Sequence, residues 1–367
     1  MRTIGVVTGS RADYGIYLPL LQDLVADGTL ELLLYVTGTH LSPEFGRTVS
    51  LIEQDGFSIS DRIEVILSSD SPEAVAKSMG LGTIGFAQVF AKRRPDWLVV
   101  LGDRFEMHAA ALAALPFKVP VAHIHGGETT EGAIDDALRH SITKLSHVHF
   151  ASTEVYRDRI IQLGEEPWRV TVSGALSLDN LARTTLLSFE ELERRVGQSL
   201  RPVPLLVTFH PTTLEYEATE WQVTQLIGAL EQVDKPIVIT APNADTGGRI
   251  IRQHLAAFAQ RSPRAVLVEN LGTQAYFSMM AIAAAMIGNS SSGILEAMSF
   301  RLPVVNIGTR QDGRVRAENV IDVGYETPAI LQGIGMALDL GQQRVLDGRT
   351  NPYGDGKAAS RIVSGLK

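Results

Sequence analysis

The fold of this chain is decided by the stretch Asp96–Gly127, DWLVVLGDRFEMHAAALAALPFKVPVAHIHGG. Two apolar runs, each ending in glycine, flank a segment with the length and composition of a helix, Arg104–Leu115. Runs that are continuous rather than alternating are typical of strands buried in a parallel sheet. A strand, a crossover helix and a second strand form a βαβ unit, so the stretch predicts a parallel sheet covered by helices.

The same alternation extends along most of the 367 residues. Further apolar runs are TIGVVTG, ELLLYVTG, HVHFAS, RVTVSG, PLLVTFHP, PIVITAP, AVLVEN, AAMIGNS and LPVVNIG. The clearest further crossover helices are Gly15–Asp27, Pro72–Arg94, Asp135–Leu145, Glu217–Val233 and Ser292–Phe300. The pattern predicts an α/β, doubly wound fold. About eleven strands are many for one twisted open sheet, so we expect two sheets in two domains.

A domain boundary is expected near Ser173–Pro204, where a strand gives way to the charged helix SFEELERRVGQSL and then to RPVP. Two doubly wound domains that face each other would leave a cleft between the carboxyl ends of their sheets. A last short helix is predicted over Ala358–Leu366.

Composition excludes several classes of function. A formal net charge of -8 argues against nucleic acid as a partner, which would favour a basic surface. The absence of cysteine excludes disulfides, thiolate catalysis and Cys-based zinc sites. The N-terminus MRTIGVVTGS has no signal-peptide pattern, and no uncharged apolar run reaches membrane-spanning length. We therefore expect a cytoplasmic protein without a membrane partner.

Two strand-to-helix turns could bind an anion. TGSRADYG offers backbone N–H groups and Arg11, although it is not the GxGxxG fingerprint and could be an ordinary turn. GNSSSGILEAMSF offers Ser290, Ser291, Ser292 and Gly293 to a diphosphate, and Glu296 to ribose hydroxyls. A serine cap followed by a glutamate is the alternative, but the serine cluster exceeds what capping needs.

Other strand ends carry acid–base groups. Asp103 follows the strand DWLVV, where a carboxylate can cap the next helix or act as a base. His210 ends the strand in VTFHP, although a lone histidine is more often structural. His123 and His125 could share one face of a strand in HIHGGETTEGAIDD, but no HExxH motif follows, so we expect no metal site.

Taken in order, eight segments resemble the hydrolysing UDP-N-acetylglucosamine 2-epimerases, from residue 3 to about residue 323. They are GSRADYG, GDRFE, HIHGGE, GAIDDALRHSITKLSHVHF, SGALSLDNL, TFHPTT, IGNSSSGILEA and NIGTRQDGR…ENVI. That family supplies N-acetylmannosamine and its relatives for sialic-acid-type sugars.

The resemblance implies the GT-B architecture of two Rossmann-like domains with a central cleft and a C-terminal helix that returns to the first domain. Here the domains would be 1–178 with 355–367, and 179–354. It also implies a UDP-sugar substrate, no cofactor, and a homodimer or homotetramer.

The family's reaction expels UDP from C1 of the sugar and removes the proton on C2, giving a glycal. Water then adds with protonation from the other face, so that C2 is inverted and UDP is not restored. Such a site needs carboxylates to move protons and stabilise an oxocarbenium-like state, and donors for the leaving diphosphate.

Matched position by position, the resemblance implies catalytic roles for Asp103, Asp135 and His210. The residues matched to the UDP-sugar site are Arg11, Arg104, Ser290, Ser291, Ser292, Gly293, Glu296 and Arg310, with His40 and Asn243 as substrate-side contacts.

One position departs from the family pattern. Relatives that act on plain UDP-N-acetylglucosamine carry HIEGGE, with a catalytic glutamate where this chain has His125. Either His125 or Glu128 takes that role, or the substrate differs. A related branch acts on UDP-2,4-diacetamido-2,4,6-trideoxyglucose, towards legionaminic acid. A non-hydrolysing 2-epimerase, a GT-B glycosyltransferase and a nucleotide-sugar-binding regulator are the alternative functions.

Overall fold

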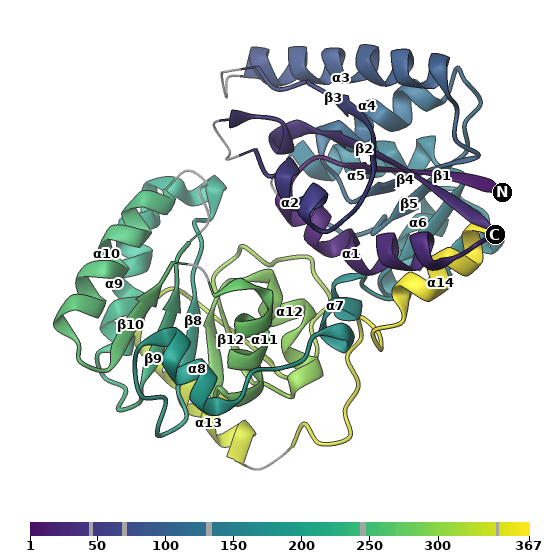
Figure 1. The fold of residues 1–367 in the computed structure, drawn as a ribbon. Helices are drawn as coiled ribbons and strands as arrows, with labels where there is room; N and C mark the ends of the chain where they lie inside the picture. Colours follow the sequence, from purple (N-terminus) through teal and green to yellow (C-terminus); the bar gives the residue numbers. More distant parts are fainter. Residues whose placement is uncertain (44–46, 68–71, 130–133, 243–246, 270, 343–344) are drawn as a thin grey trace. The chain divides into compact units, whose positions relative to one another are not determined.

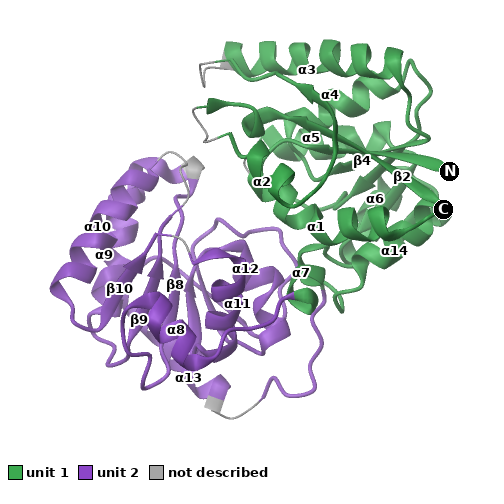
Figure 2. Cartoon of the chain, in the orientation of Figure 1, with its two compact units in different colours: residues 1–183, 353–367 green, residues 184–352 purple. Residues whose placement is uncertain are grey.

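The chain forms two compact units. The computed structural model describes residues 1–43, 47–67, 72–129, 134–242, 247–269, 271–342 and 345–367. Unit 1 comprises Met1–Arg183 and Tyr353–Lys367, and unit 2 comprises Thr184–Pro352 (Figure 2). The last segment of the chain thus belongs to the unit that begins it.

Unit 1 is built on a seven-stranded parallel sheet with the order β3-β2-β1-β4-β5-β6-β7. The strands are β1 Arg2–Thr8, β2 Leu30–Thr37, β3 Ile59–Ile63, β4 Trp97–Leu101, β5 Val121–Ile124, β6 Val148–Ala151 and β7 Val170–Val172. The central strands are buried on both faces, which explains their continuous apolar runs.

Helices cover both faces of this sheet (Figure 1). The helices of unit 1 are α1 Arg11–Ala26, α2 Val49–Gln54, α3 Pro72–Lys92, α4 Phe105–Ala114, α5 Ile134–Leu145, α6 Glu154–Gln162, α7 Ser177–Arg183 and α14 Ala358–Leu366. Helices α1 and α14 share one hydrophobic core with the sheet, and α3 and α4 share the core on the opposite face.

The last helix, α14, is fixed in unit 1 by specific hydrogen bonds. Asp179 of α7 accepts the backbone N–H groups of Ala358 and Ala359 at 2.9 Å each. These are among the N–H groups that a helix leaves without an intrahelical partner. At the other end, Arg2 donates to the carbonyl of Leu366 at 2.8 Å.

Unit 2 has a six-stranded parallel sheet with the order β10-β9-β8-β11-β12-β13. Its strands are β8 Leu205–Thr208, β9 Ile237–Thr240, β10 Ala265–Val268, β11 Ala285–Gly288, β12 Val304–Ile307 and β13 Val320–Val323. Its helices are α8 Phe189–Val196, α9 Thr219–Leu230, α10 Gly248–Arg261, α11 Gly272–Ile282, α12 Ser291–Leu295 and α13 Thr327–Gln342. Residues of α9, α10 and α13 form one core with the sheet.

Short 3-10 turns complete the elements: η1 Gly38–His40, η3 Pro167–Arg169, η4 Thr213–Ala218 and η5 Ala297–Phe300. The predicted α/β fold with two Rossmann-like parallel sheets is confirmed. Among the described residues, no helix combines the length and the hydropathy that crossing a bilayer requires.

Candidate functional site

The carboxyl edge of the unit 1 sheet gathers the acid–base residues. Because all strands run in parallel, the loops that follow them meet at one edge. Asp103 follows β4, His125 and Glu128 follow β5, and Asp135 lies in the first turn of α5. Asp103 does not cap α4, whose N-cap position is Arg104; its carboxylate forms an ion pair with Arg139 of α5 instead.

Arg139 joins three segments of this edge. In addition to the ion pair with Asp103, its Nη1 atom lies 3.4 Å from Oε2 of Glu128 and donates to the carbonyl of His125 at 3.4 Å. Arg139 is buried, and an arginine is buried only where partners compensate the loss of water. Our sequence analysis missed this residue, although it follows Asp135 by one helical turn and so shares its face.

His125 turns into the protein. Its backbone φ is +63°, in the left-handed region that few residues other than glycine adopt. The backbone N–H of Leu176 donates to its Nε2 atom at 3.2 Å, and its Nδ1 atom lies 3.5 Å from Oε1 of Glu128. Because Nε2 accepts a hydrogen bond, the ring proton lies on Nδ1 and points at the carboxylate. Ser152 donates to the same Oε1 atom at 2.7 Å.

The pKa of Asp135 is shifted by its surroundings. Burial first, and then the charge of Asp103, raise the pKa of Asp135 above its ordinary value, while Arg104 and Arg139 oppose the rise. A carboxyl group with a raised pKa holds its proton to higher pH, which is the direction that a proton donor needs.

A second charged group lies beside the loop after β1. Arg104 donates to Glu106 at 2.9 and 3.2 Å and lies 4.0 Å from Asp13. Burial raises the pKa of Asp13 to about 6, with Arg104 opposing the rise. Arg11, at the first position of α1, is exposed. Asp13 and Glu106 carried no sequence signal beyond their places in the first turns of helices.

His40 has no exposed surface. Its Nε2 atom lies 3.0 Å from the hydroxyl of Thr8, and its Nδ1 atom lies 2.8 Å from that of Thr48. Burial lowers the pKa of His40 to about 4, so the ring is neutral. These contacts tie β1 to the segment after η1, and substrate contact by His40 stays a prediction.

In unit 2, the ends of the adjacent strands β8 and β11 are joined by a reciprocal pair of hydrogen bonds. The N–H of His210 donates to the Asn289 side chain at 2.7 Å, and that side chain donates to the carbonyl of His210 at 2.8 Å. Arg310 donates to the carbonyl of Asn289 at 3.1 Å. Burial, and then the charge of Arg310, lower the pKa of His210 to about 4. The structure therefore places a neutral histidine near an arginine at this edge.

The serine cluster opens helix α12. Ser290 is its N-cap and accepts the N–H of Ser292 at 3.3 Å, while Ser291, Ser292 and Gly293 form the first turn. Glu296 is buried at the end of this helix, and the hydroxyl of Tyr276 lies 3.4 Å from that of Thr208 at the end of β8. The predicted contact Asn243 lies outside the described residues.

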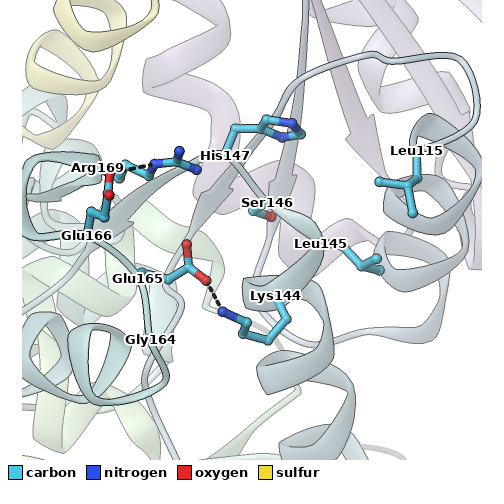
Figure 3. A pocket seen from close by; sticks show the side chains of 9 residues that line it. All are labelled: Leu115, Lys144, Leu145, Ser146, His147, Gly164, Glu165, Glu166 and Arg169. Carbon is cyan, nitrogen blue, oxygen red and sulfur yellow. Dashed lines mark hydrogen bonds and ion pairs between the residues drawn. The ribbon is translucent and has the colours of Figure 1, made fainter.

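A cavity of about 430 Å³ lies elsewhere, at the amino edge of the unit 1 sheet (Figure 3). Its lining comes from the segments that precede β6 and β7 and includes Lys144, His147, Glu165, Glu166 and Arg169. Its charged groups pair with one another, Lys144 with Glu165 and Arg169 with Glu166. It is not the candidate site, because the predicted residues of unit 1 lie at the opposite edge.

Comparison with known proteins identifies the family. The family model described as UDP-N-acetylglucosamine 2-epimerase matches residues 22–367. The chain is 41% identical, over 88% of its length and 84% of the relative's, to the GDP/UDP-N,N'-diacetylbacillosamine 2-epimerase (hydrolyzing) of Campylobacter jejuni. It is 38% identical, over 100% of its length and 96% of the relative's, to the UDP-N,N'-diacetylbacillosamine 2-epimerase (hydrolyzing) of Legionella pneumophila.

The fold agrees with solved structures. The UDP-GlcNAc 2-epimerase of Neisseria meningitidis, solved with UDP-GlcNAc bound, matches with a TM-score of 0.83 and 21% identity, covering 100% of this chain and 99% of that one. The two parallel sheets therefore have the GT-B type of secondary structure that the family resemblance implied. The chain belongs to the UDP-N-acetylglucosamine 2-epimerase family, as an enzyme of the hydrolysing 2-epimerase type.

Proposed function

We propose that this enzyme hydrolyses a UDP-2-acetamido sugar with inversion at C2, and that its preferred substrate is UDP-2,4-diacetamido-2,4,6-trideoxyglucose, which is UDP-N,N'-diacetylbacillosamine. The observation that carries the proposal is the identity of 41% and 38% to two relatives named as hydrolysing 2-epimerases of that sugar. The products would be UDP and the 2,4-diacetamido manno sugar, a precursor of legionaminic-acid-type sugars.

Unit 2 has the groups that a leaving UDP needs. We assign the diphosphate to Ser290, Ser291, Ser292, Gly293 and Arg310, because N–H, hydroxyl and guanidinium donors stabilise the charge that develops as the bond from C1 to oxygen breaks. Glu296 would accept the ribose hydroxyls. His210 is neutral, so it can donate a hydrogen bond to a phosphate without the cost of a second buried cation beside Arg310.

Unit 1 has the groups for the sugar ring. Asp103 and Asp135 interact electrostatically, and two neighbouring carboxylates with different environments are suited to separate acid and base roles. In the elimination, one carboxylate takes the C2 proton and UDP departs with its electron pair, leaving a double bond between C1 and C2. In the hydration, water adds its hydroxyl to C1 and a proton reaches C2 from the opposite face. Arg11, Arg104 and His40 remain proposed substrate-side groups.

The test follows both half-reactions by NMR in D₂O. The protein is incubated separately with UDP-N-acetylglucosamine and with the diacetamido analogue, and we expect free UDP to equal the manno product, with deuterium at C2. We expect a higher kcat/KM for the analogue. If neither sugar releases UDP, the proposed function is wrong, and if UDP-GlcNAc is the better substrate, the proposed specificity is wrong. The native mass of the same preparation tests the expected homodimer or homotetramer.

A further inference from the structure

The buried group centred on Arg139 goes beyond the acid–base assignment. The group is defined by Arg139, Asp103, His125, Glu128 and Ser152, and it joins α5 to the ends of β4, β5 and β6. We propose that Arg139, Glu128 and His125 are positioning residues that hold the Asp103 carboxylate in place, rather than groups that touch the sugar. This inference rests on the proposed function for the role of Asp103.

The guanidinium geometry suits this role. Arg139 bonds Asp103 through Nη2, while its Nη1 atom reaches both Glu128 and the His125 carbonyl. Burial alone would lower the pKa of Arg139, but the charges of Asp103 and Glu128 outweigh it and keep that pKa above its ordinary value. Asp136 adds a weaker attraction. A planar fork can bond two carboxylates at once, whereas an ammonium group is a single point charge.

The Glu128 carboxylate is enclosed by protein donors. Oε1 accepts from Ser152 at 2.7 Å and lies 3.5 Å from Nδ1 of His125, and Oε2 lies 3.4 Å from Arg139. The other ring nitrogen of His125 is bonded to the Leu176 N–H, so the imidazole cannot turn towards a ligand without leaving a buried donor unpaired. Glu128 therefore supports Arg139, and His125 fixes Glu128 to the segment that follows β7.

Two substitutions separate the charge of Arg139 from its geometry. Arg139→Lys keeps the charge but loses the fork, so we expect kcat for UDP release to fall about 100-fold with KM little changed. Arg139→Gln loses both, so we expect in addition that the limb of kcat against pH that Asp135 sets moves to higher pH. Arg139 opposes the raised pKa of Asp135 in the native enzyme, as Arg104 does, and a carboxylate that loses a nearby cation holds its proton to higher pH.

The matched control is Arg159→Lys. Arg159 of α6 donates to the carbonyl of Gly127 at 2.5 Å, so it anchors the same loop through its backbone. No ion pair joins it to Asp103 or Glu128 among the contacts of the described residues. We expect its kcat to stay within about threefold of the native value, with an unchanged pH profile.

Glu128→Gln keeps the test decisive if an Arg139 variant does not fold, because the amide preserves an acceptor for Ser152 and the size of the side chain. We expect its kcat to fall by only about tenfold, since Arg139 still holds Asp103. A loss of about 1,000-fold or more would mean that Glu128 itself transfers the proton and would overturn the inference. An active Arg139→Gln variant with the native pH profile would overturn it too. Absence of UDP release by the native enzyme would instead contradict the proposed function.

Discussion

At position 125 the chain has a histidine, where the family resemblance implies a catalytic glutamate in enzymes that use plain UDP-N-acetylglucosamine. The sequence left open whether His125 or Glu128 replaces that group. In the structure the imidazole points at Glu128 and at the Leu176 N–H, and its backbone has a positive φ. The histidine therefore contacts Glu128 and the Leu176 N–H, behind the carboxylates to which we assign the chemistry, and is not one of the proposed reactive groups.

His125→Asn tests this interpretation, because asparagine tolerates a positive φ but is too short to bridge both partners. The Leu176 N–H would lose its acceptor, so we expect a loss of about 1 to 3 kcal/mol in the free energy of unfolding. We expect kcat to fall about tenfold through the loosened Glu128. Urea denaturation and steady-state kinetics measure both. A fall of about 1,000-fold in kcat at native stability would instead identify His125 as a group that acts on the sugar.

Asp103→Asn removes the charge that the proposed chemistry needs but keeps the size of the side chain. We expect kcat to fall at least about 1,000-fold while the Kd for UDP, measured by calorimetry, changes little, because UDP is assigned to unit 2. Asp61→Asn, on the edge strand β3, is the matched control and should keep native kinetics. Near-native turnover by Asp103→Asn would refute the catalytic role of Asp103.

At the scale of elements, the sequence predicted the strands that are buried on both faces, such as β4 and β8, and also the partly buried edge strands β7 and β10. The edge strands β3 and β13 were missed, because ISDRI and VIDV contain charged residues and are not continuous apolar runs. The loops that follow predicted strands could be read from the sequence, since glycine, serine, aspartate and histidine mark them. The role of Arg139 could not be read from the sequence, because it comes from contacts between α5 and loops that are distant in sequence.

The junction of β8 and β11 is an element-scale feature with a direct test. Gly288 ends β11 with a φ of +138°, and a Cβ atom there would lie 2.0 Å from the carbonyl oxygen of Thr208. Gly288→Ala would strain the backbone and force the two strands apart at the position where His210 and Asn289 bond each other.

We expect Gly288→Ala to lower the free energy of unfolding of unit 2 by roughly 3 kcal/mol or more and to weaken UDP binding. Gly335→Ala is the control: it lies in helix α13, and a Cβ atom there meets nothing within 4 Å. Gly335→Ala should leave the free energy of unfolding of unit 2 unchanged or raise it by up to about 1 kcal/mol. Equal stability of the two variants in thermal unfolding would contradict the close approach of the strands.

At the scale of the molecule, buried histidines link stability to pH. Burial lowers the pKa of His123 to about 3 and that of His40 to about 4, and both are in unit 1. In the unfolded chain both titrate near their ordinary value of about 6.5. As pH falls below that value, the unfolded state binds protons that the folded state does not bind. The contribution of these histidines to the free energy of unfolding is therefore present at neutral pH and is lost on acidification.

Asp13 opposes part of this loss, because its pKa is raised to about 6 and protonation between pH 6 and 4 favours the folded state. His40, His123 and Asp13 together give a loss of roughly 2 to 3 kcal/mol in the free energy of unfolding between pH 7 and pH 5. His210 of unit 2, whose pKa is also lowered to about 4, adds to the loss in the same direction. Urea unfolding followed by circular dichroism at both pH values measures it. His40→Gln should reduce the slope of the free energy of unfolding against pH by about 1.4 kcal/mol per pH unit, because one group that binds a proton only in the unfolded state contributes that much. A midpoint that is equal or higher at pH 5 would mean that these histidines are not neutral in the folded protein.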